Sequence, residues 1–221
     1  GSGKTTMLRL IAGLQRPSTG RIRRVGDATI GYVSQLQLQH PWMPLTVGEV
    51  ITTARYRTRG LWGRLRSTDH QVCRDAAERL EVSDLWQRRF TDLSGGQRQR
   101  TVIARALAGE ASVLLLDEPI TGLDLASQRV ILDVMAKHRD EGGLVVFSTH
   151  HLDETRLCDR VLLIRGKILG DGPPDAVLTS AKLADLFGAH ALRGADHEPI
   201  LVIDDHLSHG GASAALTDRT P

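Results

Sequence analysis

Short apolar runs alternate along this chain with longer stretches in which apolar residues recur every three to four positions. A continuous apolar run is typical of a strand buried on both faces, and the longer spacing is typical of an amphipathic helix. The apolar runs predict strands, the last two joined in a hairpin at Gly166, over Ala28–Ser34, Val113–Leu116, Leu144–Ser148, Asp159–Arg165 and Lys167–Leu169. The helical spacing predicts helices over Thr6–Leu14, Thr46–Arg57, Thr68–Leu80, Ser94–Ala108 and Leu125–Arg139.

This alternation of buried strands and helices predicts an α/β fold built on a parallel sheet. The stretch from about residue 46 to 108 interrupts the alternation because its helices follow one another without a strand. We therefore expect a single domain over 1–221, with a catalytic core of 1–40 and 109–170, a helical subdomain of 41–108, and a C-terminal helix and polar tail of 171–221. Thr46 and Glu49 have the spacing of a capping box at a helix start.

The composition is that of a globular domain, with 41% hydrophobic and 24% charged residues. No apolar run approaches the roughly 20 residues needed to cross a bilayer, so a membrane function would need a second chain. The net charge of +2 does not indicate nucleic-acid binding. Cys73 and Cys158 are isolated, which excludes a zinc-type spacing and suits a reducing cytosol.

The first six residues, Gly1-Ser2-Gly3-Lys4-Thr5-Thr6, match the end of the phosphate-binding P-loop pattern. Small residues let backbone N–H groups wrap closely around phosphate oxygens, and the following helix adds the positive end of its dipole. Lys4 would reach the β- and γ-phosphates of a nucleotide, and the Thr5 hydroxyl would bind Mg²⁺. A flexible Gly-Ser terminus is the alternative reading of the same residues.

The predicted strand at Val113–Leu116 is followed directly by Asp117 and Glu118. Ligands of open α/β sheets bind at the carboxyl ends of the strands, where this pair would lie. Asp117 is expected to hold Mg²⁺ through water, and Glu118 to orient and polarise the attacking water as general base. The alternative is a strand that ends at a solvated acidic turn.

A second glycine-rich helix start occurs at Leu93-Ser94-Gly95-Gly96-Gln97. Such a start is another anion-binding helix N-terminus, and one nucleotide cannot easily use two of them from one chain. A head-to-tail dimer, in which Ser94 of each chain closes over the γ-phosphate held by its partner, accommodates both. Ser94 is also expected to be an ordinary N-cap.

Six segments, in the family's order, resemble motifs of the ATP-binding cassette (ABC) family of transport ATPases. They are Walker A at Gly1–Thr6, the Q-loop at Gln35, the signature at Leu93–Gln97, Walker B at Leu114–Glu118, the D-loop at Thr121–Asp124 and the switch histidine at His150. In this family, the first P-loop glycine, the strand before it and an adenine-stacking aromatic residue precede Gly1, so we expect a longer chain to fold and bind ATP better.

The resemblance also implies roles. Gln35 would sense Mg²⁺ and the attacking water, Asp124 would act across a dimer interface, and His150 would contact the γ-phosphate. His151 stands where the family commonly has aspartate and receives no role. The implied ligands are ATP and Mg²⁺, and the implied partners are a membrane permease, a second copy of the chain and no nucleic acid, at the cytoplasmic face of the membrane.

Segments Pro44–Val50, Arg55–Arg57 and Gly60–Arg64 resemble the manganese/zinc/iron branch of ABC importers, which implies divalent-metal import with a solute-binding protein. A generic helical surface is the alternative. Export stays open, whereas soluble ABC ATPases usually carry tandem cassettes or a long coiled-coil insertion, and neither occurs in 221 residues. Asp204, Asp205, His206 and His209 could sense a metal, although a solvated tail is favoured because metal ligands need a rigid frame.

Overall fold

The computed structural model of the 221-residue chain describes residues 2–23, 26–34, 44–60, 64–179, 192–193 and 199–200. These residues belong to two compact units, residues 1–157 and residues 158–221. Among the described residues, no helix is both long enough and apolar enough to cross a membrane. Gln35 and the tail residues Asp204, Asp205, His206 and His209 lie outside the described residues.

The first unit is built around a parallel sheet, as the sequence predicts. Within the described residues this sheet has three strands in the order β1 (Ile30–Val33), β2 (Val113–Asp117) and β3 (Leu144–Ser148). β2 lies between the other two, and Leu114, Leu115 and Leu116 are completely buried. Burial on both faces explains why this segment is apolar at every position and not only at alternate ones.

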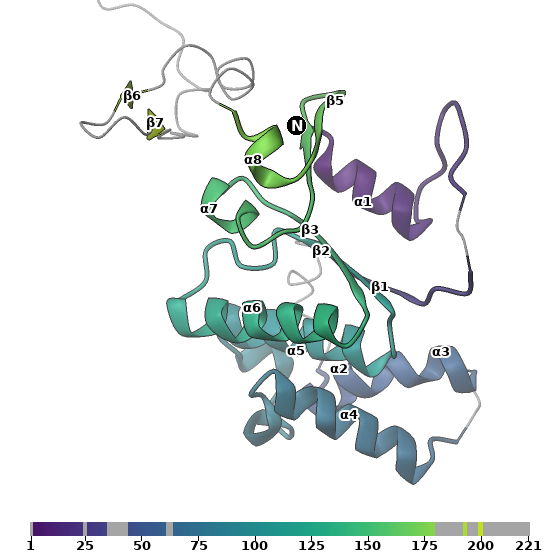
Figure 1. The fold of residues 1–221 in the computed structure, drawn as a ribbon. Coiled ribbons are helices and arrows are strands. Elements are labelled where there is room, and N and C mark those ends of the chain that lie inside the picture. Colours follow the sequence, from purple (N-terminus) through teal and green to yellow (C-terminus); the bar gives the residue numbers. More distant parts are fainter. Residues whose placement is uncertain are drawn as a thin grey trace, which may run out of the picture. The chain divides into compact units, whose positions relative to one another are not determined.

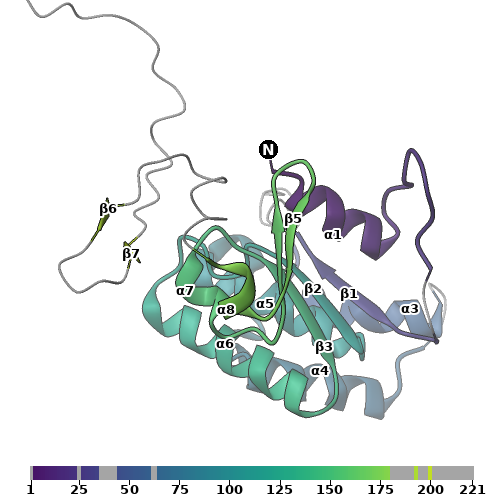
Figure 2. The same cartoon turned by 45° about the horizontal axis from the view of Figure 1, so that its top comes forward.

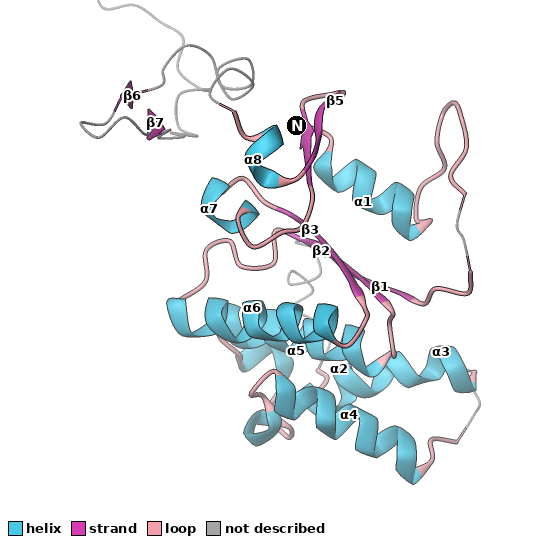
Figure 3. Cartoon of the chain, in the orientation of Figure 1, coloured by secondary structure: helices cyan, strands magenta, loops and turns pink. Residues whose placement is uncertain are grey.

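Helices cover both faces of the sheet (Figure 1, Figure 3). α1 (Lys4–Ala12) lies on one face, and α5 (Gly95–Ala108) and α6 (Leu125–Asp140) lie on the other. α5 approaches β1 closely at Gly31, where an added Cβ would lie 3.2 Å from the Cβ of Ala106 in α5 and 3.0 Å from the Cβ of Ala111. A larger residue at this position would therefore have to displace its neighbours by a few tenths of an ångström.

The helical region packs on α5. It consists of α2 (Val47–Thr52), η2 (Thr53–Arg55), α3 (Tyr56–Arg59), α4 (Ser67–Arg79), η3 (Ser83–Leu85) and η4 (Phe90–Asp92). Its buried residues belong to the same hydrophobic cluster as those of the sheet. The predicted capping box is confirmed: the Thr46 N–H donates to Glu49 Oε2 over 2.8 Å, and the Glu49 N–H donates to Thr46 Oγ1 over 3.3 Å.

The single helix predicted over Thr46–Arg57 is interrupted by the 3₁₀ turn of η2. The hydroxyl groups of Thr52 and Thr53 donate to the carbonyl groups of Gly48 and Val50, both over 2.6 Å. Hydroxyl groups that bond back to the preceding turn compete with the regular helical hydrogen bonds. This local competition accounts for the break.

Other predicted boundaries shift by a few residues. The sequence predicts a helix over Thr6–Leu14, whereas α1 begins at Lys4 and ends before Gly13, which adopts a left-handed conformation with φ 75°. A glycine in this conformation terminates a helix, so Leu14 lies outside it. β1 is shorter than the predicted Ala28–Ser34, whereas β3 has the predicted bounds.

A group of charged residues around the buried Asp69 and Arg55 joins η2, α3, α4 and the residue pair that follows α5. The Asp69 side chain is completely buried and accepts hydrogen bonds from Arg55 Nε and Arg59 Nε, each over 2.9 Å, and from the Arg66 N–H over 2.9 Å. Arg55 also pairs with Glu110 at the end of α5. The Arg59 guanidinium, followed by the Arg66 N–H, lowers the pKa of Asp69 well below its usual range. The charge cluster therefore depends on Asp69 being ionised.

The second unit contains the predicted hairpin. β4 (Val161–Ile164) pairs antiparallel with β5 (Ile168–Gly172), and the turn residue Gly166 has φ 68°. The short helix α8 (Pro174–Val177) packs on both strands and places Val177 against Val161 and Leu163. Two further short strands, β6 (Leu192–Arg193) and β7 (Pro199–Ile200), pair with each other.

Candidate nucleotide site

The carboxyl ends of β2 and β3 are joined by a hydroxyl group. Asp117 ends β2 and lies in register with Ser148, which ends β3. Ser148 Oγ donates to Asp117 Oδ1 over 2.6 Å and accepts from the Glu118 N–H over 3.0 Å. Ser148 thus orients both predicted acidic residues. Ser148 is not among the residues predicted from the sequence, although a hydroxyl residue at the end of a buried strand is a signal for this role.

Glu118 has an unusual backbone conformation, with φ 50° in the left-handed region. This conformation costs a non-glycine residue about 1–3 kcal/mol and persists only where the surrounding structure holds it. Here the Ser148 hydrogen bond holds the Glu118 N–H. The conformation turns the chain sharply as it leaves the strand end.

His150 lies beside Glu118, as expected for two residues that follow neighbouring strands. Its Nδ1 is 3.7 Å from Glu118 Oε1, and the side chains of His150 and Glu118 are 36% and 19% exposed. The structure therefore brings together two of the three predicted catalytic residues and keeps both accessible. The third, Gln35, lies outside the described residues, and the strand before it, β1, ends at the same sheet edge.

The predicted phosphate-binding segment leads into α1. Figure 2 and Figure 1 both show α1 beginning at the end of the sheet where β2 and β3 finish. Gly3 adopts φ 97° at the N-cap, and Lys4 Nζ donates to Ser2 Oγ over 3.3 Å. Thr5 and Thr6 lie in the first turn, which contains no acidic residue, so its N–H groups suit an anion. Gly1 lies outside the described residues.

The residues predicted to hold Mg²⁺ have a suitable donor type. Thr5 offers a hydroxyl oxygen and Asp117 a carboxylate oxygen, and Mg²⁺ prefers such hard oxygen ligands. Asp117 is 3% exposed and is oriented by Ser148. Thr5 and Asp117 therefore fit the predicted ion. Gln35 lies outside the residues that the structure describes.

The second glycine-rich segment forms the start of α5, with Ser94 as N-cap. The Gln97 N–H donates to Ser94 Oγ over 3.2 Å, and the Ser94 N–H donates to Gln97 Oε1 over 3.0 Å. The Gln97 side chain therefore caps its own helix. Gly95 has open space where a side chain would be, whereas a Cβ on Gly96 would lie 2.2 Å from Ser127 Oγ.

Asp124 caps the neighbouring helix, α6. Its carboxylate accepts from the Ser127 N–H over 2.8 Å and from Ser127 Oγ over 2.9 Å, and these donors lower the pKa of Asp124. Because Gly96 packs against Ser127, the starts of α5 and α6 lie side by side. Ser127, which was not predicted, thus connects the Ser94 segment to Asp124.

The two predicted phosphate-binding helix starts belong to helices on opposite faces of the sheet. α1 carries Lys4 and α5 carries Ser94 (Figure 1). That one nucleotide does not use both starts of the same chain stays a prediction.

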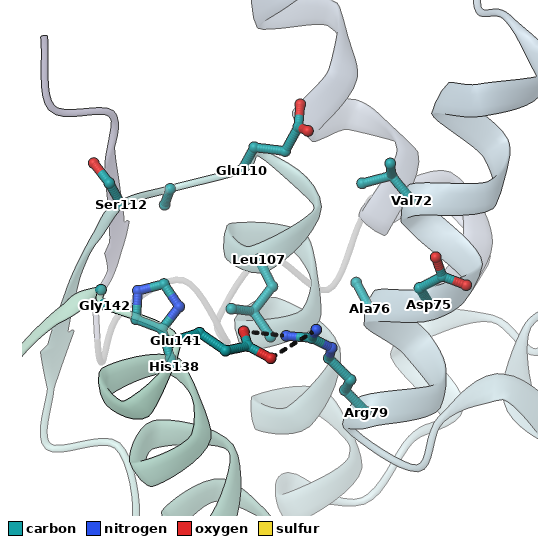
Figure 4. A pocket seen from close by; sticks show the side chains of 12 residues that line it. Val72, Asp75, Ala76, Arg79, Leu107, Glu110, Ser112, His138, Glu141 and Gly142 are labelled. Carbon is teal, nitrogen blue, oxygen red and sulfur yellow. Dashed lines mark hydrogen bonds and ion pairs between the residues drawn. The ribbon is translucent and has the colours of Figure 1, made fainter.

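A groove of about 410 Å³ lies between α4, α5 and α6, at the end of the sheet where β2 begins (Figure 4). The Arg79 guanidinium forms two hydrogen bonds with Glu141, of 3.0 and 3.1 Å, and lowers the pKa of Glu141. The lining residues are Val72, Asp75, Ala76, Arg79, Leu107, Glu110, Ala111, Ser112, His138, Glu141, Gly142 and Gly143. It contains none of the predicted site residues.

A parallel sheet with Asp117 and Glu118 at a strand end and a Gly-Lys-Thr helix start defines the P-loop nucleoside triphosphatase class. Within that class, the family model described as ABC transporter matches residues 1–121. The chain belongs to the ABC transporter family, and the resemblance stated from the sequence is confirmed. It is the ATP-binding subunit of a transporter, and it couples ATP hydrolysis to transport.

Curated relatives include proteins of metal transport systems. The chain is 34% identical over 197 residues to the chelated iron transport system membrane protein YfeB of Yersinia pestis, covering 85% of this chain and 67% of that protein. It is 33% identical over 198 residues to the manganese transport system ATP-binding protein MntA of Synechocystis, covering 85% and 76%.

Solved structures agree with this assignment. A metal-chelate type ABC transporter in an inward-facing conformation is 34% identical, with a TM-score of 0.77 over 85% of this chain and 74% of that chain. A bacterial ABC transporter cassette solved as a dimer is 26% identical, with a TM-score of 0.67 over 78% of this chain and 81% of that chain.

Proposed function

We propose that this chain hydrolyses ATP between two copies of itself, at the cytoplasmic face of the membrane, to drive import of a divalent metal through a separate permease. The observation that carries the catalytic part is the oriented pair at the end of β2. Ser148 holds both Asp117 and the Glu118 N–H, and α1 begins at the same end of the sheet. The identity of the transported ion rests on the similarity to metal transport proteins.

In the proposed reaction, Lys4 and the N–H groups at the start of α1 bind the β- and γ-phosphates. Glu118 accepts a proton from water, the water oxygen attacks the γ-phosphorus, and ADP leaves with the electrons of the broken bond. Glu118 suits this role because it is 19% exposed and lies next to the buried Asp117.

Thr5 and Asp117 would hold Mg²⁺, with Gln35 as a further ligand from the end of β1. The ion would neutralise part of the charge that develops on the phosphate oxygens. His150 would donate to the γ-phosphate, and Gln35 would also report the state of the nucleotide to the permease.

The second copy would supply its Ser94 segment. Ser94 Oγ already accepts the Gln97 N–H, so its hydroxyl hydrogen can be donated to a γ-phosphate oxygen. The exposed Gly95 leaves space for that approach, and Asp124 lies close by through the Gly96 and Ser127 contact. A bacterial ABC transporter cassette solved as a dimer supports the pairing of two copies.

A solute-binding protein would complete an import system.

Transport measurements test the proposal in cells from which this gene has been deleted and to which it is returned on a plasmid. Restoring the wild-type gene should restore uptake of radioactive manganese or iron, whereas the Glu118→Gln and Lys4→Ala variants should not. Molybdate uptake, measured in the same cells, is the control that distinguishes transport of an oxyanion from transport of a divalent metal.

Three outcomes would count against parts of the proposal. Restored molybdate uptake without manganese or iron uptake would show that the transported substrate is an oxyanion and not a divalent metal. Metal efflux that depends on the gene would reverse the direction of transport. Uptake that survives Glu118→Gln would remove the catalytic assignment.

A further inference from the structure

Two consecutive histidines follow β3, and their rings are in contact. The ring centroids of His150 and His151 are 4.1 Å apart, and the ring planes are inclined by 39°. Rings at this separation contact each other directly.

The backbone around these rings is held at both ends. Before them, Ser148 is bonded to Asp117 and to the Glu118 N–H. After them, the His151 N–H donates to Thr149 Oγ1 over 2.9 Å, and α7 (Leu152–Thr155) begins at the next residue. The base of the His151 side chain is therefore fixed relative to the strand end.

His150 itself is held less firmly on its other side. The distance of 3.7 Å between its Nδ1 and Glu118 Oε1 exceeds that of a good hydrogen bond. Its side chain is 36% exposed, so the surrounding protein leaves part of the ring uncovered and does not by itself fix the ring orientation. The neighbouring ring of His151 is in contact with the His150 ring and is a second constraint on its orientation.

We infer that His151 is a positioning residue for His150. This inference rests on the proposed function, in which His150 donates to the γ-phosphate. The His151 ring covers one side of the His150 ring and keeps Nδ1 towards Glu118, which leaves Nε2 for the phosphate. His151 touches neither the nucleotide nor the attacking water, and it acts through the orientation of its neighbour.

The test compares two substitutions in the full-length protein by steady-state ATP hydrolysis. His151→Ala removes the ring, and kcat should fall by roughly 3- to 10-fold because orientation of a catalytic group is lost. The KM for ATP should change by less than about twofold, because Lys4 and the α1 start bind the phosphates. His151→Phe keeps a ring without the imidazole nitrogens and should restore kcat to within about twofold of wild type.

A double variant separates this inference from the proposed function. His150→Ala alone should abolish most turnover, and adding His151→Ala should then have no further effect. If His150→Ala leaves turnover normal, the role of His150 in the proposed function fails. If His150→Ala acts as expected but His151→Ala equals wild type, or His151→Phe is as slow as His151→Ala, positioning by the His151 ring is overturned.

Discussion

The position and backbone conformation of Glu118 are restricted by several neighbouring groups. It follows the buried Asp117, adopts a left-handed backbone, and has its N–H bonded to Ser148. This conformation costs a non-glycine residue about 1–3 kcal/mol, and Glu81 and Glu110 share it. Nothing in its own residue type requires that conformation, so the environment imposes it.

Glu118→Gln should therefore abolish turnover without unfolding the protein. Hydrolysis should fall by about 10²–10⁴-fold because the amide cannot accept the proton of the attacking water. ATP binding should remain, and the ATP-bound dimer should accumulate. Glu81→Gln is the matched control, since Glu81 is exposed and also has a left-handed backbone, with φ 51°. Near-normal turnover by Glu118→Gln would exclude it as the general base.

At the scale of elements, buried charges connect the helices. Asp69 on α4 binds Arg55 at the end of η2 and Arg59 on α3, while Arg55 also reaches the end of α5 through Glu110. Removing one partner from such a group leaves a buried charge without compensation. These ion pairs therefore define how α3 and α4 sit on α5.

The stability contributed by Asp69 should depend on pH. Its folded-state pKa is lowered, so the contribution is complete above the unfolded-state pKa of about 3.9 and is lost as the pH falls through the folded-state value. Asp69→Asn should lower the free energy of unfolding at neutral pH, with a difference from wild type that shrinks below about pH 4. Chemical denaturation at several pH values measures this difference.

Asp75→Asn provides the control on the same helix, because Asp75 is exposed and accepts a hydrogen bond from the Gln71 side chain. It should change stability little at any pH. An Asp69→Asn protein that is as stable as wild type at neutral pH would contradict the role assigned to the cluster.

At the scale of the whole molecule, α1 and α5 present two anion-binding starts on opposite faces of the sheet. Each start would form half of a nucleotide site in a monomer. ATP would bridge two chains because its γ-phosphate can accept hydrogen bonds from both starts. Hydrolysis would remove the bridge, so the energy for transport would come from the different affinities of closed and open dimers for ATP.

Ser94→Arg should abolish ATP-dependent dimerisation and leave ATP binding to the monomer intact. The arginine would occupy the position of the partner's γ-phosphate contact, whereas Lys4 and α1 remain unchanged. Light scattering with and without ATP, in the Glu118→Gln background, measures this effect. Ser83→Arg, which adds the same charge at an exposed serine elsewhere, should dimerise normally.

Mixing the Lys4→Ala and Ser94→Arg chains extends the test. The mixed dimer has one site with both residues intact and one with neither. Partial recovery of hydrolysis would indicate independent sites, and no recovery would indicate that both sites are needed. Normal ATP-dependent dimers of Ser94→Arg would refute the arrangement between two chains.

The parallel α/β class, the order of the motifs and most element positions can be predicted from local patterns, because periodicity and capping are properties of neighbouring residues. Thr46 and Glu49 are three positions apart, as are Ser94 and Gln97, so each pair can form capping hydrogen bonds as soon as its helix begins. Tertiary structure alone decided that Ser148 orients Asp117 and that Gly96 packs on Ser127. These contacts join residues some 30 positions apart. They depend on strand register and on how closely two helices pack, to within a few tenths of an ångström. No pattern along the chain encodes either quantity.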